Sequence, residues 1–323
     1  MKIKIFFLLL FLTNLTFAQK SRIERLTNIP YDKYELPIDN DTITFYLTTT
    51  SDNDKNLPLI VYIQGSTTES LFIEHENQIA VTEHYFWYQA AKEKCRLLIV
   101  EKPSVKFLQT GHSKEYDIKF SLDSWGKTIV TAINYVTANE KINKNKILVA
   151  GHSEGGITAA RVANLMGEKI SNVAILAGEG SSQLYSLYKF ADDGTYFNIP
   201  NLETSTQRIN YLTKEWKNIL ADPDNTEKKF FGFSYLRWSS FLKTSVIDEL
   251  ENYNGKILIV QGTADKAVHP ESAIVAYTSL LSKGKNIELQ LIENADHSFN
   301  ILNKPETDGR KMVIEQTIKW FNE

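Results

Sequence analysis

Short apolar runs recur along this chain, and segments with the spacing of amphipathic helices separate them. Each run has four to six residues, mostly β-branched or aliphatic, as expected of strands buried on both faces of a parallel sheet. The runs are Leu59–Ile63, Leu97–Val100, Ile147–Ala150, Val173–Leu176, Ile257–Val260 and Ile287–Ile292. Helices are predicted at about Thr82–Lys94, Leu122–Asn139, Gly155–Met166, Pro270–Lys283 and Glu306–Phe321. This alternation predicts an α/β fold with a mostly parallel, doubly wound sheet. Thr42–Thr50 alternates in polarity and predicts a half-exposed strand that begins an antiparallel edge.

One stretch, at about residues 180–254, interrupts this alternation. It separates two predicted neighbouring strands by far more than a crossover requires, and it is rich in aromatic residues. We predict that this insert is a mostly helical cap; extra helices packed beside the sheet are the alternative. Trp216, Phe231, Tyr235 and Trp238 are candidates for the wall of an apolar substrate pocket. If they only pack the core of the insert, the pocket should be sought in the loop at 102–121.

The motif Gly-His-Ser-Glu-Gly at residues 151–155 directly follows an apolar run and precedes a helical pattern. This strand, tight turn and helix is the context in which a Gly-x-Ser-x-Gly motif exposes a nucleophilic serine. Gly151 and Gly155 suit the turn because side chains at these positions would collide with the neighbouring strand and helix. Ser153 is therefore the predicted nucleophile, at the carboxyl end of the sheet and close to a helix N-terminus.

A serine hydroxyl needs a base to accept its proton, and a carboxylate to orient that base. His297 follows the predicted last strand and precedes the terminal helix, which places its loop beside the serine. Asp265 follows the strand Ile257–Val260 and reaches the same edge of the sheet. Asp296 is less suitable, because a residue adjacent to His297 has difficulty folding back onto its ring. The chain order Ser, Asp, His is the one expected of α/β-hydrolases.

The oxyanion that forms on the substrate requires hydrogen-bond donors already in place. The backbone amide of Glu154 is the first candidate. The second is expected in the loop after Leu59–Ile63, where Gln64-Gly65-Ser66 offers the amide of Ser66 or of Gly65. These donors and the three catalytic candidates all lie on the sheet and not on the insert.

With these motifs in place, the chain resembles the α/β-hydrolase superfamily, within its dienelactone hydrolase and prolyl oligopeptidase-like branch. The motifs are Gly-His-Ser-Glu-Gly-Gly, Gln-Gly-Thr-Ala-Asp-Lys-Ala-Val and Ala-Asp-His-Ser-Phe. The resemblance implies hydrolysis of a carboxylic ester, lactone or peptide through an acyl-enzyme, with no cofactor and no metal. Two departures limit it. Gln64-Gly65 stands where many relatives have His-Gly, and dienelactone hydrolases use a cysteine where this chain has Ser153.

The first residues predict export. Lys2 and Lys4 precede an apolar run that is too short to span a bilayer and ends near Thr16-Phe17-Ala18, so residues 1–18 resemble a signal peptide. We expect cleavage before Gln19 and a periplasmic or extracellular enzyme; an uncleaved membrane anchor is the alternative. The single cysteine, Cys95, cannot form an intramolecular disulfide and is interpreted as a packing residue.

The amino-acid composition limits the classes of partner that this protein is expected to bind. The 36 basic and 39 acidic residues are mixed along the chain, so no charge patch favours nucleic acid or, apart from the export signal, a membrane. The expected partner is a small-molecule acyl ester or a short peptide.

An esterase is preferred, because the peptidases of this branch usually carry a β-propeller for which there is no room between Gln19 and Ser153. A small aminopeptidase or oligopeptidase-like enzyme is the alternative, and a non-catalytic binding protein on the same fold is the second.

Overall fold

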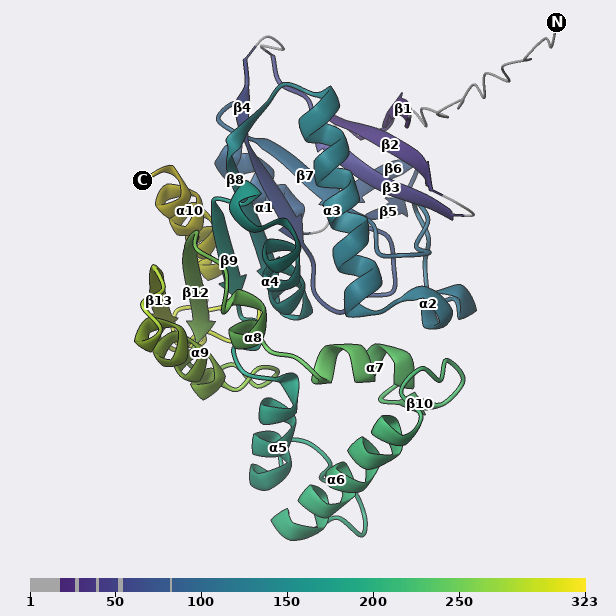
Figure 1. The fold of residues 1–323 in the computed structure, drawn as a ribbon, viewed down its shortest axis with the longest axis vertical. Helices are drawn as coiled ribbons and strands as arrows, with labels where there is room; N and C mark the ends of the chain where they lie inside the picture. Colours follow the sequence, from purple (N-terminus) through teal and green to yellow (C-terminus); the bar gives the residue numbers. More distant parts are fainter. Residues whose placement is uncertain (1–17, 27–28, 39–40, 52–54, 82) are drawn as a thin grey trace, which may run out of the picture.

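The computed structural model describes residues 18–26, 29–38, 41–51, 55–81 and 83–323. Within these ranges the main sheet has nine strands in the order β1-β2-β3-β7-β4-β8-β9-β12-β13 (Figure 1). Its strands are β1 (Gln19–Arg22), β2 (Tyr31–Ile38), β3 (Asp41–Thr48), β7 (Arg96–Val100), β4 (Leu57–Ile63), β8 (Ile142–His152), β9 (Asn172–Leu176), β12 (Lys256–Gly262) and β13 (Ile287–Ile292). From β7 to β13 all neighbours are parallel. The predicted α/β class is confirmed.

The antiparallel end of the sheet is wider than the sequence predicted. The strand expected at Thr42–Thr50 is β3, and it is antiparallel to β7 as expected of such an edge. It is not the outermost strand, because β2 and β1 pair beyond it. In β2 the charged residues Lys33 and Glu35 alternate with the buried Tyr34 and Leu36, so no continuous apolar run marks this strand.

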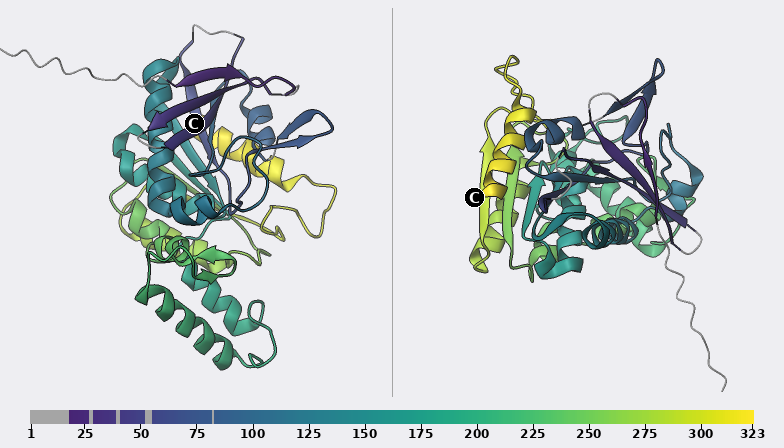
Figure 2. Two further views of the ribbon diagram at one scale, coloured as in Figure 1. Left: turned by 90° about the vertical axis from the view of Figure 1, so that its right-hand side faces the viewer. Right: turned by 90° about the horizontal axis from the view of Figure 1, so that it is seen from above.

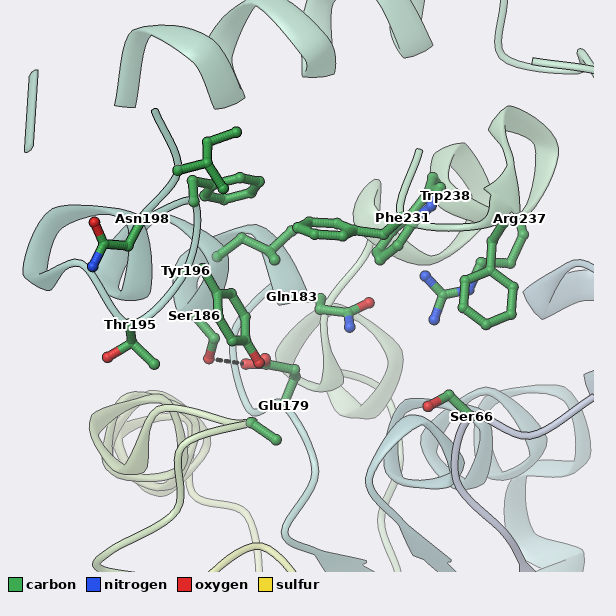
Figure 3. A pocket seen from close by; sticks show the side chains of 15 residues that line it. Ser66, Glu179, Gln183, Ser186, Thr195, Tyr196, Asn198, Phe231, Arg237 and Trp238 are labelled. Carbon is green, nitrogen blue, oxygen red and sulfur yellow. Dashed lines mark hydrogen bonds between the residues drawn. The ribbon is translucent and has the colours of Figure 1, made fainter. Parts of the chain in front are cut away.

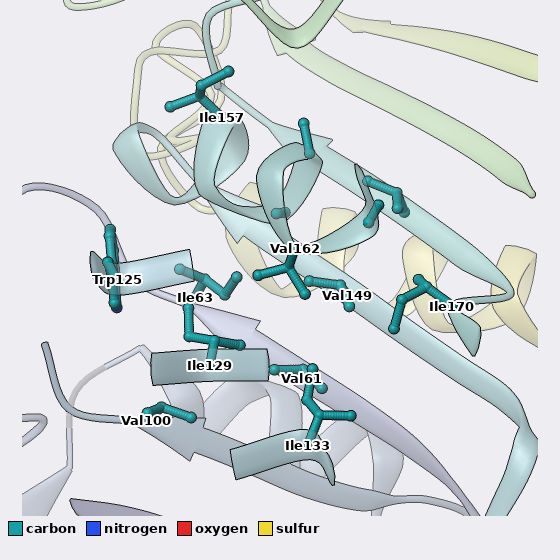
Figure 4. Packing of buried hydrophobic residues seen from close by; sticks show 14 of the residues in the cluster. Val61, Ile63, Val100, Trp125, Ile129, Ile133, Val149, Ile157, Val162 and Ile170 are labelled. Atoms are coloured by element: carbon teal, nitrogen blue, oxygen red, sulfur yellow. The ribbon is translucent and has the colours of Figure 1, made fainter. Parts of the chain in front are cut away.

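Helices cover both faces of the sheet (Figures 1 and 2). One face packs against α3 (Leu122–Asn139), α4 (Glu154–Met166), α8 (Val246–Leu250) and α9 (Pro270–Ser282), and the other against α1 (His84–Ala91) and α10 (Gly309–Asn322). Figure 4 shows the first core, where Ile129 and Ile133 of α3 and Val162 of α4 meet Val61 and Val149 of the sheet. The neighbouring strand residues, such as Ile60 and Leu148, pack in the core on the opposite face, which explains the near-continuous apolar strands.

The insert is mostly helical and has a small core of its own. It contains α5 (Gln183–Asp193), α6 (Ser205–Ala221), the two-residue strands β10 (Lys229–Phe230) and β11 (Phe233–Ser234), and α7 (Tyr235–Leu242) before α8. Leu187, Leu212 and Trp238 are members of its buried cluster. In Figure 1 helices α5, α6 and α7 lie beyond the carboxyl ends of β9 and β12, the edge of the sheet at which open α/β folds bind ligands.

Shorter elements complete the description: α2 (Lys114–Lys119), a hairpin of β5 (Phe72–His75) and β6 (Gln78–Val81), and a 3-10 turn at Gly167–Lys169. Cys95 is buried, and burial raises the pKa of its thiol to about 11, consistent with a packing role. The proposed signal segment, apart from Ala18, lies outside the described residues. No helix in the described ranges is long and apolar enough to cross a membrane.

Candidate active site

Ser153 stands in a sharp turn between β8 and α4. Its φ and ψ are 56° and −124°, a positive-φ conformation that residues with side chains rarely adopt. The flanking glycines make the turn possible, because a Cβ on Gly151 would lie 1.9 Å from the Gly155 carbonyl oxygen, and one on Gly155 would lie 2.3 Å from the Ile63 carbonyl oxygen. The Ser153 amide donates to the Leu176 carbonyl at 2.9 Å, which fixes the turn on β9. This is the geometry of a nucleophile elbow.

Asp265 and His297, which are far apart in the sequence, meet at the same edge of the sheet. Nδ1 of His297 donates to Oδ2 of Asp265 at 2.9 Å, so Nε2 is left without the proton in the neutral ring. The amides of Ala267 and Val268 donate to Oδ1 of Asp265 at 2.7 and 2.9 Å. Burial acts to raise the pKa of this carboxyl, but the hydrogen bonds and the charge of His297 outweigh it, so its pKa lies below the usual range.

The other carboxylate considered, Asp296, has a different role. Its Oδ1 accepts from the amides of Ser298 and Asn300 at 2.9 and 2.8 Å, which shapes the turn that carries His297. The structure therefore pairs His297 with Asp265, while Asp296 is engaged by the loop backbone.

His152, the residue before the serine, contacts the His297 loop. Its Nε2 lies 2.9 Å from the His297 carbonyl oxygen, which can only accept, so Nε2 carries the proton. Burial lowers the pKa of His152 against the opposing charge of Glu83, whose Oε2 is 3.8 Å from its Nδ1. Glu83 also accepts from Tyr62 and pairs with Arg310. This partly buried network holds the backbone of the loop next to the nucleophile.

The loop after β4 passes beside Ser153, where the sequence predicts the second oxyanion donor. A Cβ on Gly65 would lie only 3.1 Å from Cβ of Ser153. Nζ of Lys102 donates to the Gly65 carbonyl oxygen at 2.8 Å. In a planar trans peptide the N–H points opposite to the C=O, so the Ser66 amide of this peptide points away from Lys102. The choice of Ser66 over Gly65 as the second donor stays a prediction.

Behind this loop lies a buried cluster of three charges. Lys102 Nζ donates to Glu154 Oε1 at 3.0 Å, and Arg237 of α7 donates to Oε2 of the same carboxylate. The three side chains are 0 to 3% exposed. Burial acts to raise the pKa of Glu154, but Arg237 and Lys102 hold it below the usual range. Burial lowers the pKa of Lys102 despite the neighbouring carboxylate.

Ser153 and His297 lie where two cavities meet. The outer cavity, of about 290 Å³, is lined by polar residues such as Thr67 and Ser70 and by the apolar Leu71 and Ile73. The inner cavity, of about 260 Å³, extends toward the insert and is lined by Glu154, Ile157, Glu179, Phe241 and Val268, among others. Ser66 lines both cavities, so the loop that carries the proposed second donor stands between them.

The inner cavity adjoins a pocket of about 470 Å³ in the insert, here called the insert pocket. The two share Ser66, Glu179, Gln183, Tyr196 and Ala267 as lining residues. In Figure 3 Phe231, Trp238 and Arg237 stand at one end of the insert pocket, Thr195 and Asn198 at the other, and Gln183 between them. Aromatic and aliphatic side chains with a few polar groups are typical of a small-molecule site.

Two of the four predicted pocket residues line the insert pocket and two do not. Phe231 and Trp238 belong to its wall. Trp216 and Tyr235 are not among its lining residues; Tyr235 belongs to the buried cluster of the insert, and Trp216 is partly buried against that cluster. Trp216 lies on α6, none of whose residues lines the pocket, whereas α7 turns Arg237 and Trp238 toward it and Tyr235 toward the core of the insert.

Glu179, at the boundary of the inner cavity and the insert pocket, has one unused oxygen. Its Oε2 accepts from the hydroxyls of Ser186 and Ser272 at 2.8 and 3.0 Å, and the first of these bonds is drawn in Figure 3. Its Oε1 is buried and has no hydrogen-bond partner. Burial raises the pKa of Glu179 to about 8, aided by the charge of Asp265. A ligand in this cavity would find a carboxyl group that needs a partner.

Sequence reasoning singled out neither Glu179, Lys102 nor Arg237 as site residues. Glu179 and Lys102 each follow a buried strand at its carboxyl end, a position that could have marked them. Arg237 gave no such signal, because its partner Glu154 is 83 positions away. Among the described residues, no group of three or more His, Cys, Asp or Glu side chains is placed to hold a metal ion.

The elbow, the paired histidine and aspartate, and the sheet define a class. The chain is a serine hydrolase of the α/β-hydrolase type. Residues 125–323 match the prolyl oligopeptidase family, Peptidase S9, and because this is more than half of the chain, the protein belongs to that family. A comparison with curated protein sequences gave no match.

Solved structures share the fold at low sequence identity. Est1E from Butyrivibrio proteoclasticus superposes with a TM-score of 0.58 at 18% identity, covering 90% of this chain and 97% of that one. Acetyl xylan esterase 1 from Thermoanaerobacterium gives 0.59 at 12% identity, with 95% and 89% covered. The acylaminoacyl peptidase of Pyrococcus horikoshii gives 0.64 at 14% identity, and the match spans 93% of this chain but 42% of the peptidase. At these identities the likeness shows the fold alone.

Proposed function

We propose that this protein hydrolyses carboxylic esters through an acyl-enzyme formed on Ser153, with His297 as general base and Asp265 as its partner. The observation that carries the proposal is the position of Ser153 and His297 between two cavities. The inner one leads to the aromatic insert pocket and suits the acyl group, which leaves the outer one for the alcohol.

The geometry supports the following sequence of steps. Nε2 of His297 accepts the hydroxyl proton while Oγ of Ser153 attacks the ester carbon, and Asp265 stabilises the resulting imidazolium. The carbonyl oxygen becomes an oxyanion that accepts from the amides of Glu154 and Ser66. His297 then donates its proton to the departing alcohol as the C–O bond breaks. Water, deprotonated by His297, releases the acid by the same steps in reverse order.

The insert pocket favours an acyl group that carries an aromatic ring. Phe197, Phe231, Phe233 and Trp238 line it, and aromatic pairs gain about 0.5–1.5 kcal/mol beyond simple burial. Structures of similar fold are named as esterases, and Est1E has been solved with ferulic acid bound. They support ester substrates of this kind for the present chain.

A substrate panel tests the proposal. We expect kcat/KM for p-nitrophenyl esters to rise from acetate to an aromatic acyl group, and to exceed that for aminoacyl p-nitroanilides by about 10²-fold or more. Ser153→Ala is the control and should remove both activities. Preference for the anilides would reject the esterase in favour of a peptidase. A wild-type protein that a fluorophosphonate does not label would support the non-catalytic alternative.

Glu179 favours a second candidate, the hydrolysis of aminoacyl or short peptide substrates. An ammonium group in the inner cavity would supply the partner that Oε1 needs, and would favour release of the proton that burial keeps on Glu179, so that an ion pair forms. The two candidates differ in the effect of Glu179→Gln. If the amine is recognised here, the variant should lose about tenfold or more in kcat/KM for an aminoacyl substrate, but little for its analogue without the amino group. Equal losses on both would reject amine recognition by Glu179.

We further propose that the protein is exported. The charged and apolar residues before Ala18 support a cleaved signal. The first strand of the sheet, β1, begins at Gln19 and pairs with β2. Cleavage before Gln19 would therefore leave the sheet complete as described.

A further inference from the structure

We propose that Lys102 is a positioning residue for the oxyanion site, and that Arg237 extends this support into the insert. The inference rests on the proposed function, since it concerns the amides of Ser66 and Glu154 as oxyanion donors. Lys102 donates to the carbonyl oxygen of Gly65, which belongs to the same peptide group as the Ser66 N–H, and to the side chain of Glu154.

The first contact sets the direction of the Ser66 amide. The Gly65 carbonyl accepts from Lys102 at 2.8 Å and from the Thr67 amide at 3.0 Å, so both directions of its lone pairs are used. Rotating this peptide to turn the Ser66 N–H away from the substrate would break both bonds. An ammonium donor also polarises the peptide and makes its N–H a stronger donor.

The second contact fixes the start of α4. Glu154 follows Ser153 directly, and its side chain is held by Lys102 on one oxygen and by Arg237 on the other. Both carboxylate oxygens are thus engaged, and the side chain is only 3% exposed. A residue held at its side chain by two charged partners has little freedom to rotate its backbone, and its amide stays where the oxyanion will form.

Aromatic rings keep the two cations in place. Nζ of Lys102 lies 4.4 Å from the Trp125 ring centroid and 4.9 Å from that of Phe120. The guanidinium of Arg237 lies 3.9 Å from the Trp238 ring centroid. Two cations share one carboxylate, so the cluster carries one excess positive charge behind the donors. In a site shielded from water, such fixed charge stabilises a developing anion.

Through Arg237, the insert helps to position one of the two oxyanion donors. It belongs to α7, whereas Ser66 and Glu154 lie on the sheet side of the site. The donors are on the sheet, as the sequence predicted, yet one of them is supported from the insert. The insert should therefore influence turnover even for an acetyl ester, whose acyl group is too small to fill the insert pocket.

The test compares Lys102→Met with Lys119→Met on an acetyl ester. Lys119 is a partly exposed lysine of α2 that pairs with Asp41 and serves as the matched control. We expect Lys102→Met to lower kcat by about 10²-fold, the loss typical of one oxyanion donor, with KM within about threefold of wild type. Its affinity for a trifluoromethyl ketone, which forms an oxyanion with Ser153, should fall by the same factor as kcat/KM. A role in folding alone would not produce this proportionality.

Two further variants keep the proposal testable if Lys102→Met does not fold. Lys102→Gln retains a neutral donor and should lose less than Lys102→Met would. Arg237→Met leaves Lys102 in place and should lower kcat on the acetyl ester by about tenfold without a matching change in KM. Folded Lys102 variants with wild-type kcat and ketone affinity would overturn the role of Lys102, and a wild-type Arg237→Met would overturn that of the insert. A wild-type enzyme that neither cleaves esters nor binds the ketone would instead reject the proposed function.

Discussion

Replacement of Asp265 by asparagine should trap His297 in the wrong tautomer. Oδ1 of Asp265 receives two backbone N–H groups, and Oδ2 receives hydrogen bonds from His297 and Gln261. All four partners are donors, and the asparagine side chain has one oxygen and one NH2 group. In either orientation the NH2 group faces donors. If it faces His297, Nδ1 of the ring must be the unprotonated nitrogen in order to accept from the introduced amide. The proton is then on Nε2, which cannot accept the one from Ser153.

The expected loss follows from this change. The base is absent in the favoured tautomer and the imidazolium loses its counter-charge, so kcat/KM should fall by about 10⁴-fold, equivalent to about 5.5 kcal/mol. The side chain keeps its size and stays fully buried, so the fold should persist. The assay is kcat/KM for an activated ester, with thermal unfolding as the check on the fold.

Asp296→Asn is the matched control for this experiment. It makes the same chemical change beside His297, but Asp296 accepts from the Ser298 and Asn300 amides, so the loss should stay within about tenfold. A folded Asp265→Asn enzyme within tenfold of wild type would refute the reasoning, and a larger loss in Asp296→Asn would transfer the role to that carboxylate.

Other predictions address the nucleophile, a buried acid and export. Ser153→Ala and His297→Ala should each lower turnover by about 10⁴-fold and stop fluorophosphonate labelling; near-normal turnover in His297→Ala would reject the triad. The pKa of Glu179 is raised from 4.5 to about 8, so the folded chain keeps a proton that the unfolded chain releases, and this contribution to stability declines as pH rises through that window. The unfolding temperature of wild type, measured relative to that of Glu179→Gln, should therefore fall between about pH 5 and about pH 8. Unfolding temperatures that change in parallel with pH would contradict the burial argument. The mass of the exported protein should correspond to a chain that begins at Gln19, and retention of residues 1–18 would support a membrane anchor instead.

The sequence predicted the parallel part of the sheet well because its strands are buried on both faces. Ile287–Ile292 was placed at the bounds of β13, and Leu122–Asn139 at those of α3. The outer strands β1 and β2 were missed, since a strand with one polar face lacks a continuous apolar run.

Motif context was as informative for the site as apolar runs were for the sheet. A glycine-flanked serine after a strand, and polar residues after two later strands, identified side chains that the structure brings to one edge. The support behind them could not be predicted. Arg237 and Glu154 meet only after the insert has folded onto the sheet, and no local pattern encodes a contact between such distant positions.

The backbone of Ser153 has a consequence for the choice of an inactive variant. A positive φ of 56° at a residue with a Cβ costs about 1–3 kcal/mol, which the rest of the fold must supply. Ser153→Ala removes the hydroxyl but keeps the Cβ and therefore this strain, so it preserves the active-site shape for studies of substrate binding. Ser153→Gly would relieve the strain and should unfold at a higher temperature, at the risk of a relaxed turn. The nucleophile thus occupies a position where the chain gives up stability to hold a reactive group, and selection for thermal tolerance alone would tend to remove it.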